Sequence, residues 1–279
     1  MMADYDFSKL RVTLWGRLMY WIVPLRKNII TSNIDRVFKD NVSPAAKKRL
    51  LYAFYSHLVM VLRDIMLVGW LSTDSMKRRV EIRGAEHFFA AVNQGKGVLV
   101  LSGHLGSWEL AVSAGLLHFD SLIDKIHIIR RPIRKKWLEQ MIFQRFYKWN
   151  LKLISSINAP KLVSRALSRK EIVLFFFDQH ASIEKNSGLA VDFFSAKAGT
   201  YRSLAVLASK YCCPVVPLSC YREAKGKHVI EFFPALKWQE HPDHSQAIYN
   251  NTLIYNQTLE RMILAHPEQW WWVHRRWKI

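Results

Sequence analysis

The chain has 279 residues, half of them hydrophobic, and carries a formal net charge of +19 from 41 Lys and Arg against 22 Asp and Glu. This composition excludes an intrinsically disordered chain, which would be poor in apolar residues, and the three cysteines, two of them adjacent, exclude a disulfide scaffold. The positive charge predicts an anionic partner, which can be nucleic acid, an acidic protein, a phosphorylated substrate or an acidic membrane surface.

The first predicted element is an amphipathic helix between residues 8 and 27. Its apolar side chains recur at three- and four-residue steps and are bordered by Lys and Arg; they are Leu10, Leu14, Leu18, Trp21, Ile22 and Leu25. This pattern is typical of a helix that lies flat in a membrane interface, and a helix packed on the domain produces it equally well. No uncharged apolar run reaches the roughly 18–20 residues that a bilayer span needs.

Strands and helices alternate after a second long helix, which is predicted over residues 45–72. The predicted strands are 80–83, 98–101, 126–129, 172–177, 214–218 and 229–233. The predicted helices are 86–93, 107–118, 135–148, 160–170, one that ends at 205–210, and 245–265. The alternation predicts an α/β fold, a single domain with a mixed, largely parallel central sheet flanked by helices. We expect residues 76–279 to form this core and residues 1–75 to form an N-terminal helical region that associates with membranes.

Three polar segments directly follow predicted strands: Ser102–Glu109, Arg130–Pro132 and Asp178–His180. Ligands of α/β sheets usually bind just beyond the carboxyl ends of the strands, so these segments are the candidate sites. The sequence has no G-x-S-x-G elbow for a serine nucleophile, and neither a P-loop nor a G-x-G-x-x-G motif for nucleotide chemistry.

His104 and Glu109 form the candidate catalytic pair. On a continuous helix they would lie about 140° apart, which argues against a metalloprotease pair. With His104 in a loop and Glu109 in the first helical turn, Gly103 and Gly106 allow the two side chains to meet. A carboxylate on one imidazole nitrogen raises the basicity of the other, which makes a general base for a hydroxyl or amine. The alternative is an ordinary loop histidine, followed by an acid that favours a helix N-terminus.

Several segments in a fixed order resemble one known family. In chain order they are His104 to Glu109 (a His-x4-Glu motif), Arg131-Pro132, Phe177-Asp178-Gln179, Phe193-Phe194, Thr200 with Ser203 and Leu207-Ala208, Pro214-Val215-Val216-Pro217, Pro267-Glu268-Gln269-Trp270, and Trp272-Val273-His274-Arg275-Arg276-Trp277-Lys278. Together they resemble the lipid A biosynthesis (lauroyl/myristoyl) acyltransferases of the lysophospholipid acyltransferase superfamily, over roughly residues 15–279. Ser195 and Ser203 depart from the family pattern, which often has glycine there. The resemblance implies a glycerolipid acyltransferase-like fold.

The resemblance also implies the chemistry and the site residues. It implies transfer of a fatty acyl chain from an acyl carrier protein or acyl-CoA thioester, as co-substrate, to a hydroxyl or amine of a lipid A precursor or related glycolipid, with no metal and no other cofactor. By analogy, His104 deprotonates the acceptor and Glu109 orients His104, without an acyl-enzyme. Arg131, beside Arg130, would bind phosphate or steady the oxyanion. Asp178 and Gln179 would shape the acceptor site. Without the resemblance, Arg130 and Arg131 are equally well explained as part of a solvent-exposed run of charges. Asp178 is then explained as a residue that caps the loop after its strand.

The expected partners follow from charge. The 125–152 segment has nine basic residues against one acid and carries interleaved aromatic side chains. This suits docking on an acidic acyl carrier protein, on an anionic glycolipid acceptor or on a membrane surface, and it would also suit single-stranded nucleic acid. A basic lipid- or nucleic-acid-binding protein without catalysis is therefore the alternative from another class.

The expected location is the cytoplasmic face of the bacterial inner membrane. Family members usually carry an N-terminal membrane-spanning helix, and this sequence leaves little room for one before the matched region. We therefore expect peripheral attachment through residues 8–27. A chain of this kind would acylate lipid A precursors or a different acceptor, such as an aryl polyene precursor or an aminolipid.

Overall fold

A computed structural model describes residues 6–23, 25–68, 70–119, 121–130, 152–155, 159–184, 187–223 and 226–278. The helices are α1 (Leu14–Ile22), α2 (Lys27–Phe38), α3 (Pro44–Val68), α4 (Thr73–Arg79), α5 (Ala85–Val92), α6 (Trp108–Leu116), α8 (Ala159–Ser168), α9 (Ser203–Tyr211) and α10 (His244–Ala265). The strands are β1 (Val80–Arg83), β2 (Val98–Ser102), β3 (Ile126–Arg130), β4 (Lys152–Ser155), β5 (Ile172–Phe176), β6 (Gly188–Phe193), β7 (Ala196–Tyr201), β8 (Val215–Arg222) and β9 (His228–Phe232).

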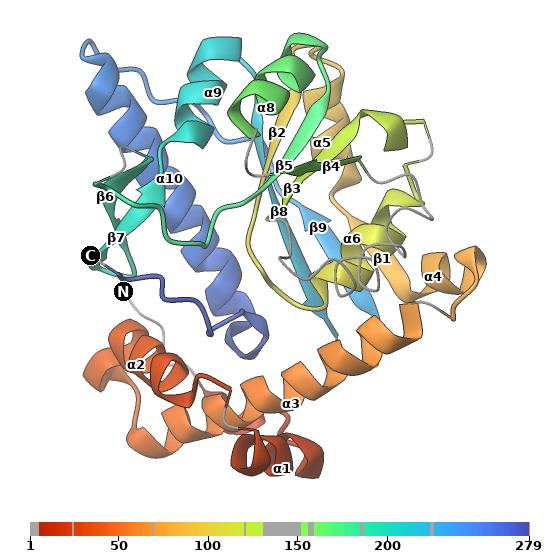
Figure 1. Cartoon of the computed structure of the whole chain (residues 1–279), viewed down its shortest axis with the longest axis vertical. Helices are drawn as coiled ribbons and strands as arrows, with labels where there is room; N and C mark the ends of the chain where they lie inside the picture. The colour runs from red at the N-terminus through yellow and green to blue at the C-terminus, as the bar shows by residue number, and fades with distance from the viewer. Residues whose placement is uncertain are drawn as a thin grey trace.

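The central sheet has seven strands in the order β1-β9-β8-β2-β5-β3-β4 (Figure 1). Every neighbouring pair is parallel except β8 with β9. This confirms the predicted α/β domain with a mixed, largely parallel sheet flanked by helices. All six predicted strands lie within a residue or two of observed ones at their starts, although β8 continues to Arg222.

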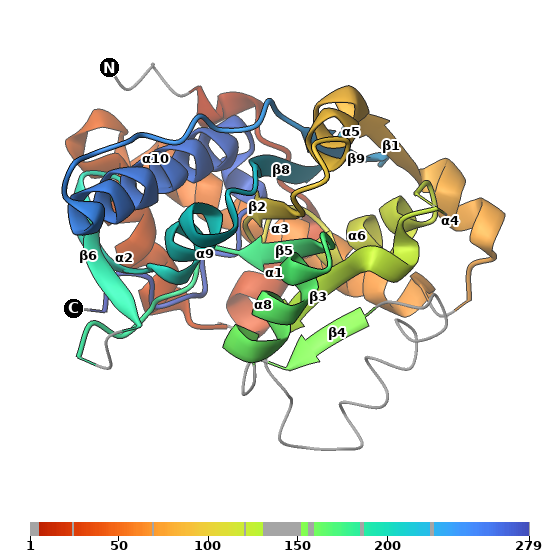
Figure 2. The same cartoon turned by 90° about the horizontal axis from the view of Figure 1, so that it is seen from above.

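The sheet is buried on both faces because alternate residues of its strands enter two separate apolar clusters. In β2, Val98 and Val100 pack into the cluster that includes α5 and α6, whereas Leu99 and Leu101 pack into the cluster that includes α9 and α10. Figure 2 shows α9 and α10 on one side of the sheet and α6 on the other. This layering explains why the strands appear in the sequence as continuous apolar runs.

The N-terminal helices pack against the α/β core through the second of these clusters. Phe38 of α2 lies 6.2 Å from Trp272, measured between ring centroids, and Phe54 of α3 lies 6.4 Å from Trp271. By length and composition α3 is apolar enough to cross a bilayer, but 56% of its most apolar stretch is buried in the fold. In Figure 1, α3 runs across the lower end of the sheet, below the strands.

Five elements were not predicted: α2, α4, β4 and the two strands of the β6–β7 hairpin. Helix α2 is mostly polar and buries a narrow stripe around Ile30 and Ile34. The β6–β7 hairpin is short, and its two-residue turn places Phe194 and Ser195 at φ values of 52° and 55°. Both angles fall in the left-handed region, which glycine adopts most readily. This conformation explains why the lipid A acyltransferase pattern often has glycine at the position of Ser195.

Candidate active site

His104 lies in the loop that joins the carboxyl end of β2 to the N-terminus of α6, as predicted. The β2–β5 register pairs Ser102 with Phe176, so His104 and Asp178 each follow two residues later, at the same level of the sheet. Gly103 is closely packed, because a Cβ there would lie 2.8 Å from Cδ1 of Leu259 and would displace that side chain. The loop is thus held tightly against the neighbouring strand and α10.

Asp178 is the carboxylate that holds the imidazole of His104. Its Oδ1 lies 2.8 Å from Nδ1 of His104, and its Oδ2 accepts hydrogen bonds from the backbone N–H of His104 (2.9 Å) and from Nε1 of Trp270 (3.0 Å). Burial would raise the pKa of Asp178, but its electrostatic interaction with His104 and the hydrogen bonds from His104 hold that pKa well below its usual range. An ionised carboxylate only accepts, so Nδ1 of His104 carries the proton and Nε2 is the free base.

This pairing differs from the expectation that Glu109 would hold His104. Glu109 does lie in the first turn of α6, but its buried Oε2 has no hydrogen-bond partner among the described residues. Burial raises the pKa of Glu109 to about 7, against the opposing effect of His104 and with a further rise from Asp64. Glu109 is therefore a buried carboxyl that titrates near neutral pH, one helical turn from the loop.

This raised pKa predicts a pH-dependent stability. The folded state holds the Glu109 proton more tightly than the unfolded chain, so its contribution to stability falls as pH rises from about 4.5 to 7. We expect Glu109→Gln to remove this loss, so that its free energy of unfolding relative to wild type improves by about 2–3 kcal/mol between pH 5 and pH 8. Urea denaturation at both pH values tests this. Glu86→Gln, on the exposed start of α5, is the control. Equal pH trends for wild type and Glu109→Gln would contradict the raised pKa of Glu109.

Of the other predicted site residues, the structure describes the side chain of Gln179 but not those of Arg130 and Arg131. Gln179 follows Asp178, and its Nε2 lies 3.5 Å from Nε2 of His104, at the edge of hydrogen-bonding distance. Arg130 ends β3, beside β5, and its side chain lies outside the described part of the structure. Arg131 and most of the basic 125–152 segment, with the predicted helix 135–148, also lie outside the described residues.

The imidazole of His104 is enclosed by three rings. It stacks on Phe176 (4.5 Å between centroids, 30° between planes) and meets Trp108 edge-on at 5.1 Å. The third ring is that of His274, also 5.1 Å away, which sequence reasoning did not identify as a site residue. His104, Asp178 and His274 offer ligand atoms within 4.8 Å of one another, a set that suits a transition metal. Because His104 and Asp178 are hydrogen-bonded to each other, an ion would have to break that bond.

A second buried polar cluster supports the β2–α6 loop from behind. Asp64 of α3 accepts hydrogen bonds from Ser107, the residue before α6, and from Arg222 at the end of β8. Nε2 of His228 lies 3.5 Å from the same carboxylate. Removing one partner of a buried ion pair leaves an uncompensated charge, so these residues depend on one another. Sequence reasoning missed this cluster because its members lie up to 164 positions apart.

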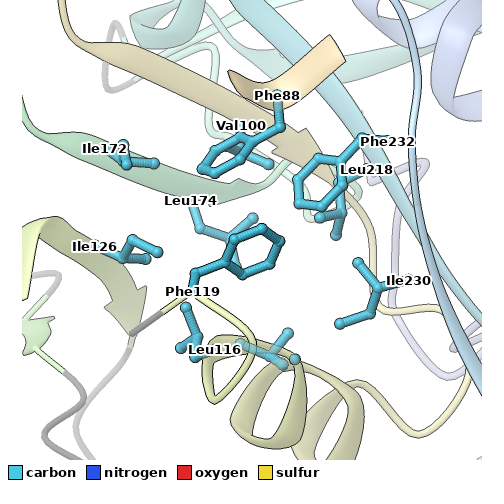
Figure 3. Close-up of a pocket in the computed structure, with 12 residues that line it drawn as sticks. Phe88, Val100, Leu116, Phe119, Ile126, Ile172, Leu174, Leu218, Ile230 and Phe232 are labelled. Carbon is cyan, nitrogen blue, oxygen red and sulfur yellow. The ribbon is translucent and has the colours of Figure 1, made fainter. Parts of the chain in front are cut away.

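An apolar cavity of about 50 Å³ lies between the sheet and α6 (Figure 3). Phe176 touches His104, and Leu174 and Ile172, on the same face of β5, line the cavity. On α6, Trp108 touches His104 and Leu116, two turns further on, lines the cavity. The rings of Phe88, Phe119 and Phe232 lie together at its wall, with centroids 4.8–5.9 Å apart. The lining exposes no polar surface, so the cavity favours hydrocarbon over water.

The chain resembles known proteins along nearly its whole length. Residues 5–279 match the family model described as bacterial lipid A biosynthesis acyltransferase. The chain is 23% identical over 270 residues to a lipid A biosynthesis acyltransferase of Haemophilus influenzae, covering 95% of this chain and 80% of that protein. It is 25% identical over 255 residues to a lipid A biosynthesis palmitoleoyltransferase of Escherichia coli, covering 91% and 79%. A 1-acyl-sn-glycerophosphate acyltransferase structure, PlsC from Thermotoga maritima, aligns with a TM-score of 0.39 at 14% identity, covering 89% of this chain and 95% of that one.

Proposed function

Because the chain belongs to the bacterial lipid A biosynthesis acyltransferase family, we propose that it moves a fatty acyl chain from an acyl carrier protein or CoA thioester to a hydroxyl or amine of a lipid A precursor or related glycolipid. The observation that carries this proposal is the buried His104–Asp178 pair, which lies at the carboxyl end of a sheet whose α6 side encloses an apolar cavity. Acyl transfer needs both a base for the acceptor and a dry place for a hydrocarbon tail, and the α6 side of the sheet offers both.

In the proposed reaction, Nε2 of His104 takes the proton of the acceptor hydroxyl as its oxygen attacks the thioester carbonyl. The tetrahedral intermediate collapses to the ester, and the C–S bond breaks. The proton on His104 then passes to the departing thiolate, which restores the neutral imidazole. Asp178 stabilises the imidazolium that forms between the two transfers. No acyl-enzyme is needed, because the acceptor itself is the nucleophile.

The cavity supplies binding energy for the acyl tail. Each methylene removed from water contributes roughly 0.8 kcal/mol, so carbons seated in the cavity would add to the affinity for the acyl donor. Anionic partners suit the net charge of +19, and acyl carrier protein and a phosphorylated glycolipid are the partners we propose.

Lipid mass spectrometry of cells with and without the gene tests this function. We expect one lipid species to lose the mass of one acyl chain when the gene is deleted, and the shifted species names the acceptor. A shift in an aryl polyene or an aminolipid would keep the chemistry and change the acceptor. An unchanged lipid profile, together with tight, salt-sensitive binding to nucleic acid, would overturn the proposal in favour of a non-catalytic binding protein.

We also propose peripheral attachment to a membrane, through α1 and the adjoining face of α3. Helix α1 exposes Trp15 and Trp21, each 68% accessible, with Leu14 and Ile22 beside them. On α3 and just after it, the exposed large apolar side chains are Leu62, Met66 and Trp70. Exposed apolar side chains gathered beside basic residues are typical of an interfacial surface.

Changing both exposed tryptophans should therefore release the protein from membranes. Burying a Trp-sized side chain contributes at least about 1.5 kcal/mol, so Trp15→Glu with Trp21→Glu should weaken sedimentation with phosphatidylglycerol vesicles by more than about tenfold. Phe89→Glu is the matched control, since Phe89 is an exposed aromatic residue on α5. Unchanged sedimentation of the double variant would argue that attachment does not use α1.

A further inference from the structure

His274 lies beside the catalytic pair, yet the mechanism above does not use it. It belongs to the C-terminal segment, which follows α10 and contacts the β2–α6 loop. The backbone N–H of Trp271 donates to the carbonyl of His104 (2.9 Å), and Leu105 forms a β-bridge with Trp270. The side-chain amide of Asn33, on α2, donates to the carbonyls of Trp272 (2.8 Å) and His274 (2.9 Å). The position of His274 is therefore fixed from two sides.

The imidazole of His274 has an unused polar atom. Its Nε2 is buried and has no hydrogen-bond partner among the described residues, although leaving such a group unpaired is costly. Buried polar groups are normally satisfied, so an unpaired one beside a catalytic residue points to a partner that arrives with the substrate. Burial lowers the pKa of His274 to about 4, despite the opposing effect of Asp178, so the ring is neutral near pH 7.

We propose that His274 is a second catalytic residue, whose Nε2–H donates a hydrogen bond to the thioester carbonyl oxygen as that oxygen becomes an oxyanion. This rests on the acyl transfer proposed above. A ring nitrogen of His274 lies within 4.8 Å of a ring nitrogen of His104 and of a carboxylate oxygen of Asp178, so a carbonyl group brought to His104 lies next to the imidazole of His274. A neutral, preorganised donor in a dry site stabilises developing charge without reorganisation.

Two substitutions separate hydrogen bonding from shape. His274→Phe keeps a planar ring without the N–H, and His274→Gln keeps an N–H donor. We expect His274→Phe to lower kcat by about 10²–10³-fold with little change in KM for dodecanoyl-CoA, and His274→Gln to stay within about tenfold of wild type. The assay follows CoA release in the presence of lipid extract from cells that lack the gene, which contains the unacylated acceptor. His266→Phe, which replaces a histidine stacked on Tyr221 at 4.0 Å, is the control.

A second measurement does not depend on turnover. In wild-type protein labelled with ¹⁵N-histidine, the ketone analogue of dodecanoyl-CoA should shift the Nε2 resonance of His274, and zinc alone should not. Full activity of a folded His274→Phe variant, or an unmoved His274 resonance with bound analogue, would overturn the role of His274 and leave the proposed function standing. A moved resonance in a protein without transferase activity would support His274 as the carbonyl donor and overturn the proposed function instead.

Discussion

His104→Ala is expected to lower acyl transfer by about 10²–10⁴-fold, because the variant loses the general base that we propose deprotonates the acceptor. The effect should appear in kcat, since the apolar cavity and the surfaces that hold the substrate are unchanged. Asp178 would keep its hydrogen bonds from the backbone N–H of residue 104 and from Trp270, so the fold should survive. Single-turnover transfer from dodecanoyl-acyl carrier protein measures the loss.

The control for this variant is His118→Ala, on an exposed histidine beyond α6. It should match wild type in rate and in thermal stability. If His104→Ala retained more than about a tenth of wild-type activity while folding normally, the general base would have to be another residue, and Glu109, with its pKa near neutral, would be the next to test.

Asp178→Asn is expected to lower kcat on the order of 10⁴-fold, although it replaces only one oxygen atom by an NH₂ group. The analogy is with catalytic triads, in which the same change forces the wrong histidine tautomer. Two N–H donors, from His104 and Trp270, point at Oδ2 of Asp178. The amide oxygen of Asn must take that place, which turns the NH₂ group toward Nδ1 of His104. Nδ1 then has to accept, the ring proton moves to Nε2, and the atom that should act as base is blocked.

The measurement is kcat across pH 6–9, with histidine tautomers read from ¹⁵N shifts. Asp192→Asn, on the solvent-facing side of the β6–β7 hairpin, is the control. Near-normal activity of Asp178→Asn together with loss of activity in Glu109→Gln would restore the pairing that sequence spacing suggested, with Glu109 as the partner of His104.

The contrast between Glu109 and Asp178 shows what sequence patterns can and cannot resolve here. Strand periodicity located both residues correctly at the carboxyl edge of the sheet, one after β2 and the other after β5. Which carboxylate meets the imidazole depends on the register of two parallel strands 74 positions apart, and no local pattern encodes that register. Spacing along the chain therefore favoured the nearer acid over the one in contact.

His274 and Asp64 were missed for a related reason. Each acts through contacts with residues far away in the sequence, and each stands in a segment whose local pattern suggests something else, a Trp-rich tail for His274 and an apolar helix for Asp64. The family resemblance included His274 within a motif but assigned it no task. Only the packing of the tail against the β2–α6 loop brings its ring within 5.1 Å of His104.

The two sides of α3 have a practical consequence for preparing a water-soluble form of the enzyme. Leu62 and Met66 face outward, whereas Asp64 faces inward and bonds to Ser107 and Arg222 beneath the catalytic loop. Trimming the N-terminal region to improve handling would thus strip a buried counter-charge from Arg222 and unseat the start of α6. Substituting the outward side chains of α3 one by one with polar residues, while Asp64 is kept, would instead leave the site intact.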